Sequence, residues 1–213
     1  SKEVYRRTKG AFDPTVAPLI QLWRRNLQQG TLPTIAEIKA LQQYVGLDYV
    51  VVNQKRVKKL KEGFTIHLNS LSASYSVDVI GNFLRSKEIK DFCIKLDNEA
   101  LAQGINNNQQ PWEVKHTIED NHFLDNHFSI YSKLNNGAIS LVKQHIVGEK
   151  EANIPIIIDS KTGYLVHGNI LAAMVLADDC ISASAYATAI LTKDFESALQ
   201  MLSSIKNIEF LLI

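Results

Sequence analysis

The stretch 64–84, which reads FTIHLNSLSASYSVDVIGNFL, constrains the fold of this chain more than any other. Every second position over residues 64–68 is apolar, and this alternation predicts a half-buried strand. After a polar turn the apolar spacing becomes helical, which predicts a helix with Ser72 or Ser74 as its N-cap. A strand, a tight turn and a helix N-terminus bring backbone N–H groups together, so an anion could bind there.

Length and composition favour one domain. With 213 residues, of which 46% are hydrophobic, the chain can bury one good core or at most two small ones. We therefore predict a single domain over residues 1–213. The two cysteines, Cys93 and Cys180, are too few for a disulfide framework and are predicted to be small core residues.

Charge and hydropathy argue against two classes of partner. The net charge is +1, from 23 basic and 22 acidic side chains, which gives no electrostatic reason to expect nucleic acid or an anionic membrane. The longest uncharged apolar run, over 170–177, is far shorter than a membrane span. We expect no transmembrane segment.

Predicted strands outnumber predicted helices and follow one another directly in the middle of the chain. This order indicates an α+β fold with largely antiparallel sheets. Besides 64–68, strands are predicted over 49–53, 56–61, 92–96, 99–102, 112–118, 128–134, 138–147, 170–177 and 209–213. Further helices are predicted from Pro18 onward and over 34–45, 180–191 and 194–205.

Three motifs carry polar side chains that suit a site. Residues 10–23, GAFDPTVAPLIQLW, predict a turn that the side chains of Asp13 and Thr15 could cap and close. Residues 154–166, IPIIIDSKTGYLV, predict a buried strand that runs into a turn. On the helix predicted over 180–191, the hydroxyls four residues apart face the same way.

The tandem DNHFLDNHF, residues 120–128, raises the possibility of a metal site. Its histidines are spaced i,i+5, whereas helical zinc pairs are spaced i,i+4, and no further ligand cluster accompanies them. We predict a solvated loop.

These motifs resemble those of the ApbE family, the FAD:protein FMN transferases. GAFDPTVAPL is similar to the family's GAFDPTVGPL almost letter for letter. Residues 67–78, HLNSLSASYSVD, follow the frame of the family's DLGGIAKGYAVD. In that frame His67 stands at the acidic position, Asn69 and Ser70 at the two glycines, and Ala73 at the lysine.

Three later segments carry the same resemblance. IIIDSKTGYLV is similar to the family's HIIDPRTGYPV, with Ile156 at the histidine position. ASAYATAI is similar to ADALATAL, with Ser184 at the aspartate and Thr188 at the threonine. LDNEALAQG is similar to the family's IGGEIRAxG, with Asp97 and Asn98 at the glycines, where side chains would crowd a nucleotide unless the pair forms an ordinary turn.

The resemblance implies a fold, an activity and a set of site residues. The fold would be two α+β lobes, related to the T-fold, that enclose a flavin cleft. The activity would be magnesium-dependent transfer of FMN from FAD to a threonine hydroxyl of a target protein. The implied cofactor-binding residues are Asp13, Thr15, Glu99, Asp159 and Thr162, and the implied metal ligands are Ser184, Thr188 and a main-chain carbonyl placed at Ser70.

The ionisable positions of the family motifs hold Ala73, Ile156 and Ser184 in this chain. These side chains cannot supply the charge or move the proton that the motif residues would, so no catalytic residue is assigned. We expect FAD and magnesium only from the resemblance, and we expect weak or lost transferase activity. The alternative is a non-catalytic paralogue that binds a ligand or a protein partner in the cell envelope.

The resemblance also implies a location. Family members belong to the cell envelope or periplasm, usually with an export or lipoprotein signal, and the chain itself carries none. Residues 1–8 have the pattern of the last turns of a helix. We therefore expect that the family's N-terminal segment is missing from this chain.

Overall fold

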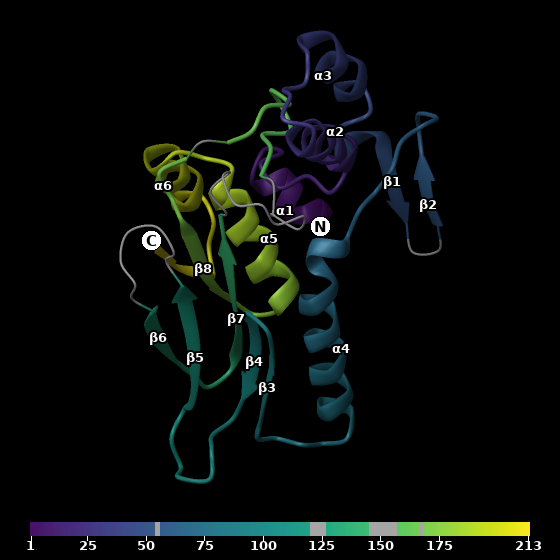
Figure 1. Ribbon diagram of the computed structural model, residues 1–213. Helices are drawn as coiled ribbons and strands as arrows, with labels where there is room; N and C mark the ends of the chain where they lie inside the picture. The colour runs from purple at the N-terminus through teal and green to yellow at the C-terminus, as the bar shows by residue number, and fades with distance from the viewer. Residues whose placement is uncertain (54–55, 120–126, 145–156, 167) are drawn as a thin grey trace.

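A five-stranded antiparallel sheet forms the centre of the computed structural model, which describes residues 1–53, 56–119, 127–144, 157–166 and 168–213 (Figure 1). Its strand order is β3-β4-β7-β8-β9, and every neighbouring pair is antiparallel. The strands are β3 (Phe92–Leu96), β4 (Glu99–Gln103), β7 (Gly137–Lys143), β8 (Ala172–Ala177) and β9 (Glu209–Leu212).

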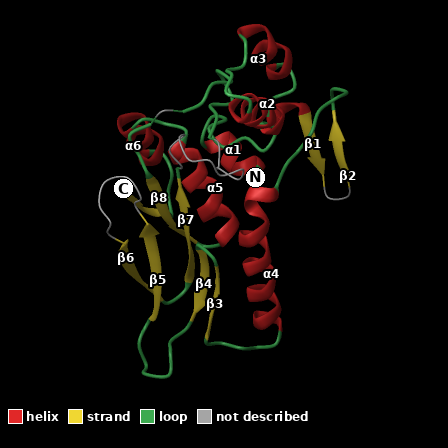
Figure 2. Cartoon of the chain, viewed as in Figure 1, coloured by secondary structure: helices red, strands yellow, loops and turns green. Residues whose placement is uncertain are grey.

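Two helices cover one face of this sheet (Figure 2). Helix α4 (Ser72–Ser86) packs on β3 and β4, and α5 (Cys180–Leu191) packs on β7 and β8. The four alanines at positions 183, 185, 187 and 189 of α5 are fully buried. Such small side chains let the helix lie close to the strands, which is why a helix with little amphipathic character can serve as the centre of the core.

The opposite face of the sheet packs against a long hairpin of β5 (Trp112–Glu119) and β6 (His127–Leu134). Val114 and Ile118 of β5 and Leu134 of β6 join Ala100 and Leu141 of the sheet in one buried cluster. Both faces of the sheet are therefore covered, so its strands can carry apolar residues at successive positions without polar residues in between.

A second group of elements lies beyond one end of the sheet in Figure 1. It contains α1 (Lys2–Arg7), α2 (Ala17–Gln28), α3 (Ile35–Gln42), the 3₁₀ turn η1 (Leu47–Tyr49) and the hairpin of β1 (Val50–Asn53) and β2 (Arg56–Lys59). Helix α6 (Phe195–Ser203) follows α5. The α+β prediction is confirmed: helices pack on purely antiparallel sheets throughout the described residues.

Local signals placed several helices correctly. Thr34 and Glu37 form a capping box at the start of α3, in which each side chain accepts from the other residue's backbone N–H. Pro18 lies in the first turn of α2, and the predicted helix over 180–191 is α5. Asp194 is the N-cap of α6, and its carboxylate accepts from Ser197 N.

The strand predicted over 64–68 is wrong, because this segment is an extended loop that pairs with no strand. Phe64 is fully buried against Leu47 and Val50, and His67 N donates to Pro14 O at 2.8 Å. The alternation therefore reflects the burial of Phe64 and the partial burial of Ile66 and not sheet pairing, and it fails at Leu68, which is 49% exposed. The predicted N-cap is also wrong: η2 (Asn69–Leu71) precedes α4, whose N-cap is Leu71 with no side-chain cap bond.

Two further predictions are tested only in part. Of the strand predicted from 154 onward, residues 154–156 lie outside the described residues, and the rest forms a single bridge between Ile158 and Leu165. Most of the tandem at 120–128 also lies outside them. Cys93 and Cys180 are both free, and Cys180 is buried as predicted. Among the described residues, no helix is long and apolar enough to span a membrane.

Candidate functional site

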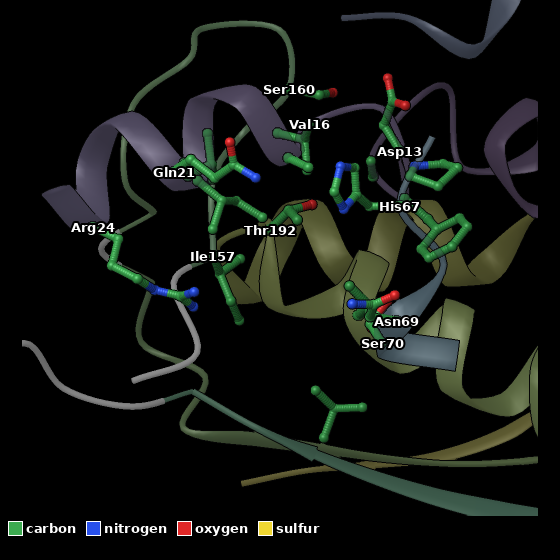
Figure 3. A pocket seen from close by; sticks show the side chains of 18 of the residues that line it. Asp13, Val16, Gln21, Arg24, His67, Asn69, Ser70, Ile157, Ser160 and Thr192 are labelled. Carbon is green, nitrogen blue, oxygen red and sulfur yellow. The ribbon is translucent and has the colours of Figure 1, made fainter. Parts of the chain in front are cut away.

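A cavity of about 480 Å³ lies where α2, the turn before α4 and the C-terminal end of α5 meet (Figure 3). Its volume is in the range of pockets that hold small-molecule ligands. The cavity is lined by Ala11, Phe12, Asp13, Pro14, Val16, Ala17, Ile20, Gln21, Arg24, His67, Asn69, Ser70, Val142, Lys143, Ile157, Ile158, Ser160, Thr188 and Thr192. Four of the five matched motifs therefore contribute residues to it, and the LDNEALAQG segment contributes none.

Asp13 and Thr15 close the turn that leads into α2. The Thr15 backbone N and its hydroxyl donate to Asp13 Oδ1 at 2.8 and 2.6 Å, and Thr15 Oγ1 accepts from Gly46 N at 2.7 Å. Burial raises the pKa of Asp13, although the two bonds from Thr15 oppose the rise. Asp13 lines the cavity, whereas Thr15 is fully buried behind it and supports the turn.

The turn before α4 supplies His67, Asn69 and Ser70 to the cavity (Figure 3). The bond from His67 N to Pro14 O fixes this turn beside the Asp13 turn. Two of the matched motifs, which are more than fifty residues apart in sequence, therefore share one wall. Ala73 follows in the first turn of α4, half-buried and outside the cavity lining.

Helix α5 brings Thr188 to the cavity and keeps Ser184 beneath it. Thr188 Oγ1 donates to Ser184 O at 2.9 Å, which leaves the lone pairs of the threonine hydroxyl free to accept. Ser184 is only 2% exposed and does not line the cavity. Of the three implied metal ligands, Ser70 and Thr188 thus share the cavity and Ser184 lies one helical turn away.

Asp159 and Thr162 lie in the turn beside the main cavity. Asp159 Oδ1 accepts from Lys161 N at 2.7 Å, and both predicted residues line a smaller pocket of about 340 Å³ that shares Thr192 with the main cavity. Ile158 and Ser160, the neighbours of Asp159, line the main cavity itself. Ile158 and Ser160 of this turn therefore line the main cavity, and Asp159 and Thr162 line the adjoining smaller pocket.

Glu99 is a buried carboxyl group under α4 and α5. Its Oε1 accepts from Ser140 Oγ at 3.0 Å, while its Oε2 has no hydrogen-bond partner among the described residues. Burial raises the pKa of Glu99 to about 7, against the opposing effect of the hydroxyls of Ser140, Ser74 and Ser184. Glu99 does not line the main cavity.

Replacing Glu99 by Gln should make folding less sensitive to pH. Glu99 has a folded pKa of about 7, above its ordinary value of 4.5, so the folded state keeps a proton that the unfolded state releases between these values. Stability therefore falls as pH rises through this window, by on the order of 3 kcal/mol. Urea unfolding at pH 5 and pH 8 should show that loss in the wild type and not in E99Q.

Glu113 offers the matched control, because it is an exposed glutamate on β5. E113Q should keep the pH dependence of the wild type. Equal loss of stability in the wild type and in E99Q between pH 5 and pH 8 would contradict this account of Glu99.

The residues present do not fit a carboxylate-held magnesium ion. Magnesium favours one or two carboxylates among its oxygen ligands. The cavity contains one carboxyl group, that of Asp13, which is engaged by Thr15 and has a raised pKa. No group of three or more His, Cys, Asp or Glu side chains within the described ranges could hold a metal ion.

Two other expectations concern positions around the site. Asp97 and Asn98 form the turn between β3 and β4, and neither lines the cavity, so the ordinary-turn interpretation holds. Ile156, which stands at the family's histidine, lies outside the described residues.

Arg24 and Gln21 line the cavity, although neither was predicted as a site residue from the sequence. They follow Ala17 and Ile20 on α2 at helical spacing, so one face of the helix forms the wall. Continuing the helical spacing of Ala17 and Ile20 along α2 would have identified both residues. Lys143, at the end of β7, also lines the cavity, although the motif analysis gave it no role.

Comparisons with known proteins agree with this arrangement. The sequence pattern of the ApbE family matches residues 1–212. The FAD:protein FMN transferase of Vibrio cholerae is 22% identical over 193 residues, which cover 86% of this chain and 56% of the relative. That of Haemophilus influenzae is 25% identical over 207 residues, covering 91% and 58%. The chain thus spans somewhat more than half the length of these relatives.

Solved structures show the same fold. The flavin transferase ApbE from Vibrio cholerae superposes with a TM-score of 0.80 at 21% identity, covering 99% of this chain and 67% of that one. The ApbE protein from Thermotoga maritima gives 0.77 at 23% identity, covering 99% and 69%. Because the family pattern extends over nearly every residue and the fold agrees, this chain belongs to the ApbE family.

Proposed function

We propose that the cavity binds FAD and that the protein is an FMN transferase with weak activity. The observation that carries this proposal is the convergence of three matched motifs on one cavity: Asp13, Ser70 and Thr188 all line it, though they are far apart in sequence. Relatives that share the family are FAD:protein FMN transferases. In this proposal Asp13, Asp159 and Thr162 contact the flavin nucleotide, and Thr15 and Glu99 support the walls.

The transfer would join a threonine oxygen of a target protein to the phosphorus of the FMN half of FAD. The bond from that phosphorus to the bridging oxygen would break, and AMP would leave. Such a transfer is accelerated by positioning and by positive charge near the phosphates. The described residues supply a shaped cavity and hydroxyl groups, but Ala73 and Ser184 supply no charge. Weak activity follows from that deficit.

The remaining parts of the proposal rest on the family alone. We propose that residues 1–213 form one ApbE-like domain, that the protein acts in the cell envelope or periplasm, and that a lipoprotein anchor belongs to the whole protein. Magnesium, which the family resemblance implies, has no carboxylate cluster to hold it among the described residues. We therefore propose FAD binding that does not depend on a protein-held metal ion.

Flavin fluorescence would test binding, and AMP release would test chemistry. FAD added to the 213-residue chain should be bound equally well in EDTA and in millimolar magnesium, with affinities that differ by less than about threefold. With a threonine-bearing target protein present as the acceptor of FMN, slow release of AMP from FAD should accompany binding, measured by chromatography and absent from a control without the 213-residue chain. Failure to bind FAD would overturn the proposal.

A second candidate function is a non-catalytic ligand-binding paralogue. It is favoured by the alanine and serine at the lysine and aspartate positions, Ala73 and Ser184. Tight FAD binding without any AMP release, with a threonine-bearing protein of the type that relatives modify present in the assay, would favour this candidate over the transferase.

A further inference from the structure

The charged groups that line the main cavity are mostly basic. They are Arg24 and Lys143 against one acid, Asp13. The chain as a whole is nearly neutral, with a net charge of +1, so this excess is a property of the cavity and not of the protein surface in general. A cavity lined mostly by charges of one sign attracts ligands of the opposite charge.

Arg24 is half-buried, and one nitrogen of its guanidinium lacks a partner among the described residues. Its Nε is buried and makes no hydrogen bond, and no ion pair within the described ranges includes this side chain. Leaving such a donor unpaired costs free energy, because water is removed and nothing replaces it. An anionic ligand would remove that cost, since the guanidinium matches phosphate oxygens with two parallel donors.

The neighbouring arginine, Arg25, does have an acidic partner. Arg25 does not line the cavity; its side chain is 63% exposed, and its Nη2 lies 3.8 Å from Glu37 Oε1. Two adjacent arginines on α2 therefore have different surroundings: one is solvated with an acidic partner, and the other faces an apolar and basic cavity.

The other charged groups leave room for an anion near Arg24. Lys143 Nζ donates to Thr117 O at 3.0 Å, which uses one of its three hydrogens. Asp13 is engaged by Thr15 through Oδ1, and in Figure 3 it lies toward the opposite end of the cavity from Arg24. Gln21 lies between Asp13 and Arg24 in Figure 3. It shares the cavity-facing side of α2 with Arg24 and adds a neutral donor.

We propose that Arg24 binds a phosphate group of the ligand and makes the cavity selective for phosphorylated flavins over riboflavin. This inference rests on the proposed function, and it deepens it by naming the group that recognises the charge of the ligand. It also accounts for how a cavity without the family's lysine and aspartate retains an electrostatic attraction for a pyrophosphate. Arg24 acts as a specificity-determining residue, and the chemical step is not assigned to it.

The test compares R24Q with R25Q by titration calorimetry in EDTA, using FAD, riboflavin and inorganic pyrophosphate as probes. A charge-assisted hydrogen bond is lost in R24Q, so FAD and pyrophosphate should bind about ten- to a hundredfold more weakly, and riboflavin unchanged. R25Q should bind all three like the wild type. Added salt should weaken FAD binding to the wild type more than to R24Q.

The outcomes separate this inference from the proposed function. Wild-type and R24Q proteins with equal affinity for FAD would overturn the role of Arg24 and leave FAD binding intact. Pyrophosphate binding that R24Q weakens, without binding of any flavin, would support the anion site and overturn the proposed function. Equal weakening of FAD and riboflavin in R24Q would overturn the inference, since it would indicate a change of shape. A wild type that binds none of the probes would overturn both.

Discussion

Asp78→Ala should lower the free energy of unfolding by about 3 kcal/mol. Asp78 lies on α4, and its carboxylate accepts from Cys180 N at 2.9 Å and from Ile181 N at 3.0 Å, at the start of α5. These backbone groups have no partner inside their own helix, and Asp78 is buried. Alanine would leave both donors buried without an acceptor. Urea unfolding followed by tryptophan fluorescence would measure the loss.

Two further variants sharpen this prediction. D78N keeps one carbonyl oxygen and should lose about half as much stability as D78A. D194A removes the N-cap of α6, an exposed acid that accepts from Ser197 N, and should lose much less stability than D78A. A D78A variant no less stable than D194A would show that the contact between α4 and α5 adds little to the fold.

Local signals in the sequence were enough to place most helices and the antiparallel strands. The capping box at Thr34 and the N-cap at Asp194 act through hydrogen bonds between residues three apart, so no tertiary contact is needed to predict them. The hairpin of β3 and β4 is likewise a local feature, with its turn at Asp97 and Asn98.

The segment at 64–68 shows what alternation cannot determine. Phe64 and Ile66 pack in a small cluster with residues of the β1 region, but residues 64–68 form no strand. Alternating apolar residues require one buried face, which a loop pressed against a hydrophobic cluster provides as well as a sheet does. Whether the segment pairs with a strand depends on contacts distant in sequence.

Residues of the site could be predicted from the sequence only where they belong to a motif that matches the family. The resemblance indicated Asp13, Ser70 and Thr188, and the structure places all three around one cavity. Arg24 was missed because it follows the matched turn and belongs to no motif, and its importance depends on the absence of a partner. Sequence patterns show which residues are present, whereas an unpaired buried donor becomes visible only when its surroundings are known.

Gly163→Ala should destabilise the protein by about 2 to 4 kcal/mol. Gly163 has φ +77°, in the left-handed region, and a Cβ placed there would lie 2.6 Å from Ile38 Cγ2 and 3.6 Å from Leu19 Cδ1. Gly163 O also accepts from Trp23 Nε1 at 2.9 Å, so the turn cannot move away without breaking that bond. Alanine would therefore add backbone strain and a clash between this turn and Ile38 of α3.

A substitution at Gly30 separates the effect of backbone strain from the effect of the clash. It has φ +69°, and nothing lies within 4 Å of a Cβ placed on it, so G30A carries the backbone strain without the clash. We expect G30A to lose about 1 kcal/mol, and the difference between the two variants in urea unfolding to report the packing at Ile38. If G163A and G30A lost the same stability, the contact between Ile38 and this turn would have to be looser than the structure shows. Because the turn carries Asp159, Ser160 and Thr162 to the two pockets, G163A should also weaken FAD binding while G30A leaves it unchanged.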